Sequence, residues 1–196
     1  MFGPARWIRG LAREQEGRAL AYVDWSTQEI AIAAGLSGDE RMMEAYTSGD
    51  PYMSFAKAAG LVPQDARKQG NEDIREVCKA IVLGINYGMG PETTAFKAGI
   101  SKAEAREFLR LHKVTYPKFR RWIDNTVTSA LFNGRMQSVF GWQRHIGRNA
   151  NPRSLMNFPM QAGGAEMMRI AAIAATEAGI EVCCPVHDAF PDLGSS

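Results

Sequence analysis

The sequence is poor in cysteine and has no long apolar run. Its 196 residues include three cysteines, and two of them, Cys183 and Cys184, are adjacent, which is a poor geometry for pairing with each other. The odd count indicates a reduced, cytoplasmic chain rather than a disulfide framework. No stretch approaches the roughly 18 continuous apolar residues of a membrane span, and the N-terminus has no apolar signal region. We therefore expect no membrane partner.

The net charge is also small, at +2 with a pI near 8.5. Bulk charge therefore does not indicate a nucleic-acid-binding protein, and any such function must be argued from where the cations stand. The hydrophobic share of 45% is enough for one real core, in a single domain or in two lobes. We find no internal repeat, low-complexity segment or flexible linker in the sequence.

One short run, 75–88, places two cations and an aromatic ring on one face of an expected helix. Arg75, Lys79 and Tyr87 stand at offsets of 0, 4 and 12, with Leu83 at offset 8. Each step of four residues returns to the same face of an α-helix with a drift of about 40°. The stripe is suited to holding a triphosphate and stacking on a base. The plainer alternative is an ordinary solvated helix face.

Two aspartates follow apolar runs near opposite ends of the chain. Asp24 ends a strand expected over 19–24, and Asp188 follows a strand expected over 180–186. A carboxylate at the end of a buried strand costs desolvation free energy unless something positive meets it. If the strands are neighbours, the carboxylates converge into a Mg²⁺ site, and two ions there would assist a phosphoryl displacement. Alternatively, each aspartate only caps a turn.

A second polar stripe is expected near the start of a long helix over 152–178. Arg153, Asn157 and Gln161 are again four residues apart. Side chains of this kind on one face can hydrogen-bond to base edges or sugars. Minor-groove acceptors are similar for every base pair, so such contacts would test pair shape rather than sequence. The alternative is an ordinary polar face.

The remaining pattern predicts an α+β fold, a small, mostly antiparallel sheet with a large helical insertion. The stripe helix is expected over 71–87 with Asn71 as its N-cap, and Asp50 is expected to cap a helix that begins at Pro51. Further helices are expected over 27–37, 39–48, 51–60, 101–113 and 118–132, and short strands over 136–140 and 143–146.

Four segments resemble motifs of the family A DNA polymerases, of the DNA polymerase I type and of phage or prophage kind. They are VDWSTQEIAIAA (23–34), REVCKAIVLGINYG (75–88), RSLMNFPMQ (153–161) and PVHDAF (185–190). They occur in the order the family has, and the resemblance covers nearly all of residues 8–190. It implies template-directed DNA synthesis from deoxynucleoside triphosphates on primer-template DNA, in a bacterium or a phage-infected host.

The resemblance also implies roles for single residues. Asp24 and Asp188 would hold two Mg²⁺ ions, and Glu29 falls where the family keeps a glutamate under the nucleotide sugar. Arg75 and Lys79 would bind the triphosphate, with Lys79 able to protonate the leaving group. The remaining predicted contacts are Leu83 and Tyr87 with the incoming nucleotide, Tyr87 and Gly88 with the template, and Arg153, Asn157, Gln161 and His187 with primer-template DNA.

The implied architecture is an incomplete right hand. Residues 1–38 would form the first part of the palm, 39–132 a helical fingers lobe and 133–196 the second part of the palm. The resemblance implies that the thumb and any exonuclease domain are missing. The protein would thus be a monomer or would require those segments. The strand that should follow Asp188 is also expected to be missing, since Pro191 and Gly194 interrupt residues 191–196.

Three residues depart from the family pattern. Leu83 stands where the family usually has an aromatic ring, Ala189 where many members have Glu, and Glu76 where a second basic residue is common. The expected absence of the thumb and of the final strand favours an alternative function, a catalytically incompetent fragment that only binds nucleotide or nucleic acid weakly. A third interpretation, a metal or thiol site at Cys183, Cys184 and His187, lacks the paired spacing of a zinc site.

Overall fold

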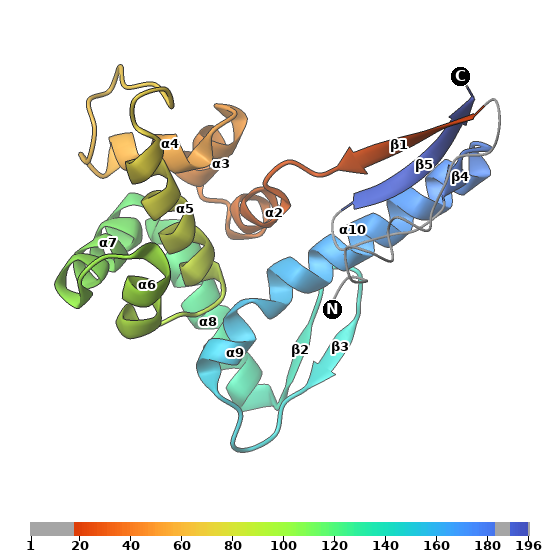
Figure 1. Ribbon diagram of the computed structural model, residues 1–196. Helices are drawn as coiled ribbons and strands as arrows, with labels where there is room; N and C mark the ends of the chain where they lie inside the picture. The colour runs from red at the N-terminus through yellow and green to blue at the C-terminus, as the bar shows by residue number, and fades with distance from the viewer. Residues whose placement is uncertain (1–17, 183–188, 196) are drawn as a thin grey trace. The chain divides into compact units, whose positions relative to one another are not determined.

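The computed structural model describes residues 18–182 and 189–195 (Figure 1). The chain forms two compact units, which we call unit 1, residues 1–28 with 161–196, and unit 2, residues 29–160. The domain boundaries expected from the sequence stay a prediction.

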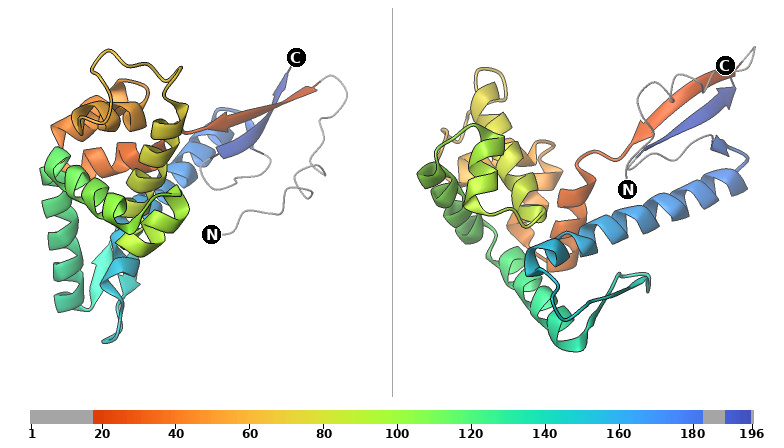
Figure 2. Two further views of the ribbon diagram at one scale, coloured as in Figure 1. Left: turned by 60° about the vertical axis from the view of Figure 1, so that its left-hand side comes forward. Right: turned by 60° about the horizontal axis from the view of Figure 1, so that its bottom comes forward.

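The described part is mostly helical, with two small antiparallel sheets, as the α+β prediction expected. Figures 1 and 2 show helices α3 to α8 packed beside one another in unit 2. In chain order the elements are β1 (Arg18–Asp24), α2 (Gln28–Ser37), α3 (Glu40–Thr47), α4 (Pro51–Ala58), α5 (Glu72–Asn86), α6 (Pro91–Ala98), α7 (Lys102–Thr115), α8 (Pro117–Asn133), β2 (Arg135–Gln137), β3 (Gln143–His145), α9 (Pro152–Met156), α10 (Phe158–Glu177), β4 (Glu181–Val182) and β5 (Ala189–Ser195). Within the described ranges, no helix is long and apolar enough to cross a membrane.

The sheet of unit 1 has the strand order β1-β5-β4, and both pairings are antiparallel. The pairing of β1 with β5 runs the whole length of β1 and places Asp24 opposite Ala189. The predicted strand over 19–24 is therefore confirmed, and the end of β1 that carries Asp24 lies beside the first residue of β5.

The prediction that residues 191–196 form no strand is wrong, because β5 includes both Pro191 and Gly194. The strand expected to be missing after the second aspartate is thus present. β4 pairs only with Asp192 and Leu193. Within the described residues, Pro191 pairs only with Tyr22 of β1. A strand tolerates proline where its missing amide hydrogen is not needed for pairing.

The long helix expected over 152–178 is two helices, α9 and α10, which are separated at Asn157. Pro159 explains the break, because it has no amide hydrogen and its ring excludes the carbonyl group four residues before it. Consequently Arg153 lies on α9 and Gln161 on α10. The expectation of one continuous helical stripe through these polar residues is wrong.

Two further features near α5 differ from the prediction. α6 was not expected, although Pro91 begins it and Gly99, in the left-handed conformation at φ 67°, ends it. Asn71 stands at the N-cap of α5 as predicted but makes no side-chain cap. Its Nδ2 instead donates to the carbonyl oxygen of Arg67 at 2.9 Å.

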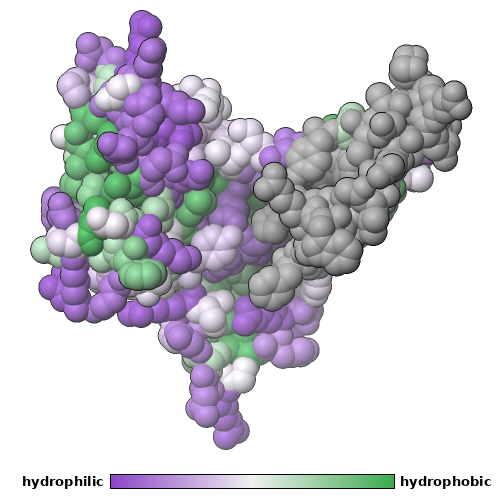
Figure 3. Space-filling view, viewed as in Figure 1, coloured by the Kyte–Doolittle hydropathy of each residue, from purple (hydrophilic) through white to green (hydrophobic). Residues whose placement is uncertain are grey.

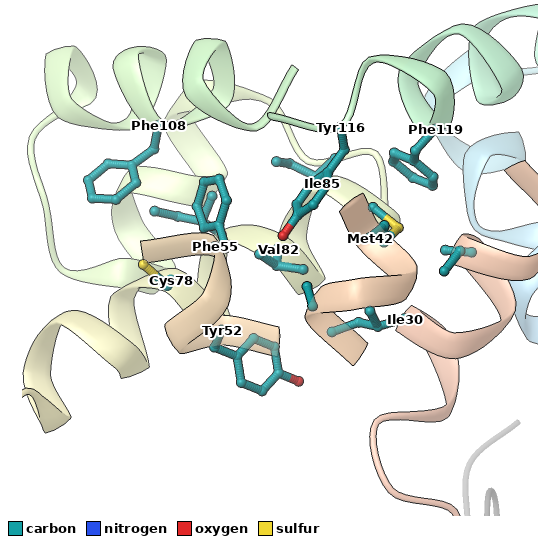
Figure 4. Close-up of a cluster of buried hydrophobic side chains, with 14 of the residues drawn as sticks. Ile30, Met42, Tyr52, Phe55, Cys78, Val82, Ile85, Phe108, Tyr116 and Phe119 are labelled. Carbon is teal, nitrogen blue, oxygen red and sulfur yellow. The ribbon is translucent and has the colours of Figure 1, made fainter. Parts of the chain in front are cut away.

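The core of unit 2 is built from the inner faces of these helices (Figure 4). Phe55 and Phe119 are fully buried in it, with the ring of His112 between aromatic neighbours. From α5 it takes Cys78, Ile81, Val82 and Ile85. Hydrophilic residues cover much of the coloured surface seen in Figure 3 and hydrophobic ones fill the spaces between them.

Asp39 joins two helices through one buried carboxylate. Its Oδ1 accepts from the amide of Met42 at 3.1 Å and so caps α3. Its Oδ2 accepts from the amides of Lys118 and Phe119, both at 3.0 Å, in the first turn of α8. Three orphan amide donors at two helix N-termini are satisfied by this side chain, which is only 2% exposed.

We predict that Asp39→Ala lowers the free energy of unfolding by about 2–4 kcal/mol, because it removes a helix cap and leaves buried amide donors without a hydrogen-bond acceptor. Urea denaturation followed by circular dichroism measures the change. Asp124→Ala is the control, since this residue lies in an exposed pair with Arg120 and should change stability by less than about 0.5 kcal/mol. Equal effects of the two substitutions would refute the double-cap account.

Candidate functional site

α5 presents one face to the core and another, charged face away from it. Cys78, Ile81 and Val82 are buried at 0%, 0% and 4% exposure. Burial raises the pKa of the Cys78 thiol to about 12, so this group stays protonated and unreactive at neutral pH. The helix runs nearly as predicted, and its buried face fixes where the side chains of Arg75 and Lys79 can lie.

Arg75 is held by residues of α4. Its Nε donates to Oδ2 of Asp50 at 2.7 Å, and its Cζ lies 5.2 Å from the centre of the Tyr52 ring. The hydrogen bond to Asp50 is the main cause that raises the pKa of the guanidinium. Asp50 is itself fixed, because its Oδ1 caps α4 by accepting from the amide of Met53 at 3.2 Å. The predicted cap at Asp50 is thereby confirmed.

Glu76 contacts both cations of the stripe. Its Oε1 accepts from Nη1 of Arg75 at 2.9 Å, and its Oε2 lies 3.8 Å from Nζ of Lys79. The side chains of Glu76 and Lys79 are 61% and 44% exposed, so water competes for this contact. Leu83 is half-buried and lines an open hollow of about 470 Å³ together with Lys79.

Tyr87 and Glu29, which the sequence places 58 residues apart, meet directly. The hydroxyl group of Tyr87 donates to Oε1 of Glu29 at 2.7 Å. Tyr87 is the C-cap residue of α5, and Glu29 lies in the first turn of α2. Two residues that were predicted separately at the nucleotide are thus neighbours, and Tyr87 remains 41% exposed.

Gly88 and Arg153 form a second pair of predicted residues that come together. Gly88 has φ 66°, and a β-carbon built on it would lie 2.4 Å from the carbonyl oxygen of Arg153. No side chain fits there, so glycine is required both by conformation and by the close approach of the two backbones. The guanidinium of Arg153 extends past Gly90, whose added β-carbon would lie 3.0 Å from Nη1.

An open, basic cavity of about 470 Å³ lies next to this contact. Its charged walls are Arg110, Lys113, Arg120 and Arg153, and no acidic residue lines it. His112 also lines it but is neutral, because burial and then the nearby charge of Arg120 lower its pKa to about 3. Arg110 and Arg120 pair with Glu107 and Asp124. Among the described residues, Lys113 and Arg153 are therefore the unpaired cations of the wall, and these can hold the phosphates of an anionic chain.

The other predicted residues are less well defined. Asn157 is half-buried between α9 and α10, and its Oδ1 has no hydrogen-bond partner among the described residues. Gln161 belongs to unit 1. Asp24 is exposed at the end of β1. Asp188 and His187, with Cys183 and Cys184, lie outside the described residues.

Sequence reasoning did not anticipate that Asp50 and Tyr52 would contact Arg75. Asp50 was identified only as a helix cap, from the Asp-Pro pair at 50–51. The hydrogen bond from Arg75 to Asp50 depends on the packing of α4 against α5, which brings together two residues 25 positions apart. The capping signal was visible in the sequence, but the tertiary contact was not.

We predict that Gly88→Ala destabilises the chain more than Gly99→Ala. Both glycines are left-handed, at φ 66° and 67°, so both variants carry the same backbone strain of about 1–2 kcal/mol. Only Gly88 has the carbonyl oxygen of Arg153 against it; nothing lies within 4 Å of the added carbon at Gly99. Thermal unfolding should show a further loss of about 1–3 kcal/mol for Gly88→Ala. Equal losses would contradict the close approach.

Comparison with known proteins places the chain in a family. A model of DNA polymerase family A matches residues 5–190. DNA polymerase I, thermostable, of Thermus aquaticus is 28% identical over 195 residues, which are 92% of this chain and 23% of the relative. DNA polymerase I of Caldicellulosiruptor bescii is 31% identical over 183 residues, which are 88% of this chain and 21% of the relative. The chain thus spans less than a quarter of the length of these relatives.

A solved structure agrees with the sequence matches. It is described as the POL domain of Pol1 from M. smegmatis in complex with DNA primer-template and dNTP. It superposes with a TM-score of 0.79 at 26% identity and covers 93% of this chain and 35% of the solved chain. From the family match over residues 5–190 and this shared fold, we conclude that the chain belongs to DNA polymerase family A.

Proposed function

We propose that this chain carries the nucleotidyl-transfer site of a template-directed DNA polymerase, which adds deoxynucleotides to a primer 3′-OH. Membership of DNA polymerase family A supports this proposal, as does the likeness to a Pol1 domain described in complex with DNA primer-template and dNTP. Primer-template DNA and deoxynucleoside triphosphates are the proposed partners. The proposed setting is the cytoplasm of a bacterium or a phage-infected host, with the chain acting as a monomer.

One observation carries the proposal more than any other. Asp24, at the end of β1, pairs with Ala189, the residue that directly follows Asp188 in the chain. Asp24 therefore lies at the end of the pair where β5 begins. Asp188 is outside the described residues, and the proposal places its carboxylate beside that of Asp24. Carboxylate oxygens are the ligands that Mg²⁺ prefers, so this donor type fits two bound ions. When bound, the ions would supply charge neutralisation at the transferring phosphoryl group.

The face of α5 supplies the proposed contacts to the triphosphate. Arg75 and Lys79 bind its β and γ phosphates, and Lys79 donates a proton to the leaving pyrophosphate. Leu83 packs against the incoming nucleotide in place of the ring that the family usually has. Glu29, held by Tyr87, stands against a 2′-OH and so favours deoxynucleotides.

The end of α5 supplies the proposed template contacts. Tyr87 and Gly88 lie at the templating base, and the basic cavity that begins at Gly88 accepts backbone phosphates through Arg153. Asn157 and Gln161 contact the minor groove of the primer-template duplex, with His187 near the primer. In this proposal residues 1–38 and 133–196 are the palm of a right hand and 39–132 its fingers. Closure of the fingers on a correct pair assembles the site.

We predict that Asp24→Ala and Asp188→Ala each lower primer extension by about 10³-fold or more, because each loses several kcal/mol of charge stabilisation in the transition state. Extension of a labelled primer by the protein, with Mg²⁺ and all four nucleotides, measures the loss. Binding of primer-template DNA should remain, since phosphate contacts elsewhere carry it.

Asp65→Ala is the matched control, since this aspartate is exposed in the loop between α4 and α5. It should extend primers at the rate of the unsubstituted polymerase. Normal extension by either variant of the proposed catalytic aspartates would refute their assignment as metal ligands.

A further inference from the structure

Arg75 meets two carboxylates on different edges of its guanidinium. Asp50 accepts from Nε, on the side edge, and Glu76 accepts from Nη1, on the end edge. Within the described residues, no hydrogen bond from Nη2 is formed. A guanidinium binds phosphate best when two of its nitrogens face the oxygens as a fork. In Arg75 the end edge, formed by Nη1 and Nη2, is the pair of nitrogens that can face a phosphate. Glu76 already occupies one of the two, Nη1.

The two carboxylates differ in how firmly they are held. The side chain of Asp50 is 26% exposed and also caps α4 through Oδ1, so it cannot leave Arg75 without breaking a helix cap. The side chain of Glu76 is 61% exposed, and no hydrogen bond other than that to Arg75 holds it among the described residues. Exposed ion pairs contribute little to stability, so Glu76 can turn into water at small cost.

Glu76 also reduces the charge of the whole stripe. Its Oε2 lies 3.8 Å from Nζ of Lys79 while Oε1 is on Arg75, so one carboxylate screens both cations. Glu76 is the residue that departs from the basic residue common at this position in the family. The departure therefore places an anion where a triphosphate is proposed to bind.

From this geometry we propose that Glu76 is an internal competitor of the triphosphate, which occupies the phosphate-binding edge of Arg75 until nucleotide displaces it. Asp50 has the opposite role. It is a positioning residue that, with the ring of Tyr52 beneath the guanidinium, holds Arg75 ready for phosphate. The inference rests on the proposed nucleotide-binding role of α5 and names which residues regulate it.

The two roles predict opposite effects from the same chemical change. E76Q and D50N each remove one negative charge beside Arg75. E76Q frees the end edge and should tighten phosphate binding about two- to fivefold, the range of an exposed ion pair. D50N keeps an N-cap oxygen, because asparagine is a good cap, but loses the charged anchor. It should weaken phosphate binding about five- to tenfold through lost pre-organisation.

The test is isothermal titration calorimetry of the chain with inorganic tripolyphosphate, without DNA and without magnesium. Glu107→Gln is the matched control, since it removes the same charge from an exposed pair with Arg110 on α7 and should leave the affinity unchanged. The gain from E76Q should largely disappear in an Arg75→Ala background. Because Glu76 is exposed, E76Q remains informative even if D50N impairs folding.

Unchanged or weaker binding by E76Q overturns the competitor role, and so does an equal gain from Glu107→Gln or in the Arg75→Ala background. Tighter binding by a folded D50N variant overturns the positioning role. The proposed polymerase function fails separately, in primer extension. If primer extension fails but the predicted changes in tripolyphosphate affinity are seen, the phosphate site is regulated as proposed but serves another reaction.

Discussion

The burial of one face of α5 is the constraint on which the candidate site depends. Cys78, Ile81, Val82 and Ile85 are at most 5% exposed, and each aliphatic side chain of this kind contributes about 1.5–3 kcal/mol when fully buried. A helix that must bury this face cannot rotate without exposing it. The direction of the charged face, the approach of Tyr87 to Glu29 and the contact of Gly88 with Arg153 all follow from that fixed rotation.

The surroundings of α5 decide what its cations can do. Arg75 touches a ring and two carboxylates, while the basic cavity beyond Gly88 has no acidic residue in its wall. Both cations of the α5 stripe contact Glu76, whereas Lys113 and Arg153 of the cavity form no ion pair within the described residues. The proposed nucleotide contact and the proposed contact to a nucleic-acid backbone therefore lie at opposite ends of α5.

Local signals in the sequence predicted the elements well, and tertiary contacts were the part that they could not supply. The Asp50–Pro51 helix start, the strand that ends at Asp24 and the helix around Arg75 and Lys79 depend on neighbouring residues and were predicted. The break at Asn157 was also a local signal, since Pro159 was visible, but the polar spacing was given too much weight. By contrast, Asp39 caps a helix that begins 78 residues later, at Pro117, and no local pattern reveals such a partner.

We propose above all that this chain carries out template-directed nucleotidyl transfer by itself. The most direct test is single-turnover primer extension by the 196-residue chain, with a labelled primer-template, Mg²⁺ and one deoxynucleotide at a time. We expect addition of the one nucleotide that is complementary to the template and no addition without Mg²⁺. Binding of primer-template and nucleotide with no incorporation would contradict this proposal and would favour a chain that only binds these ligands.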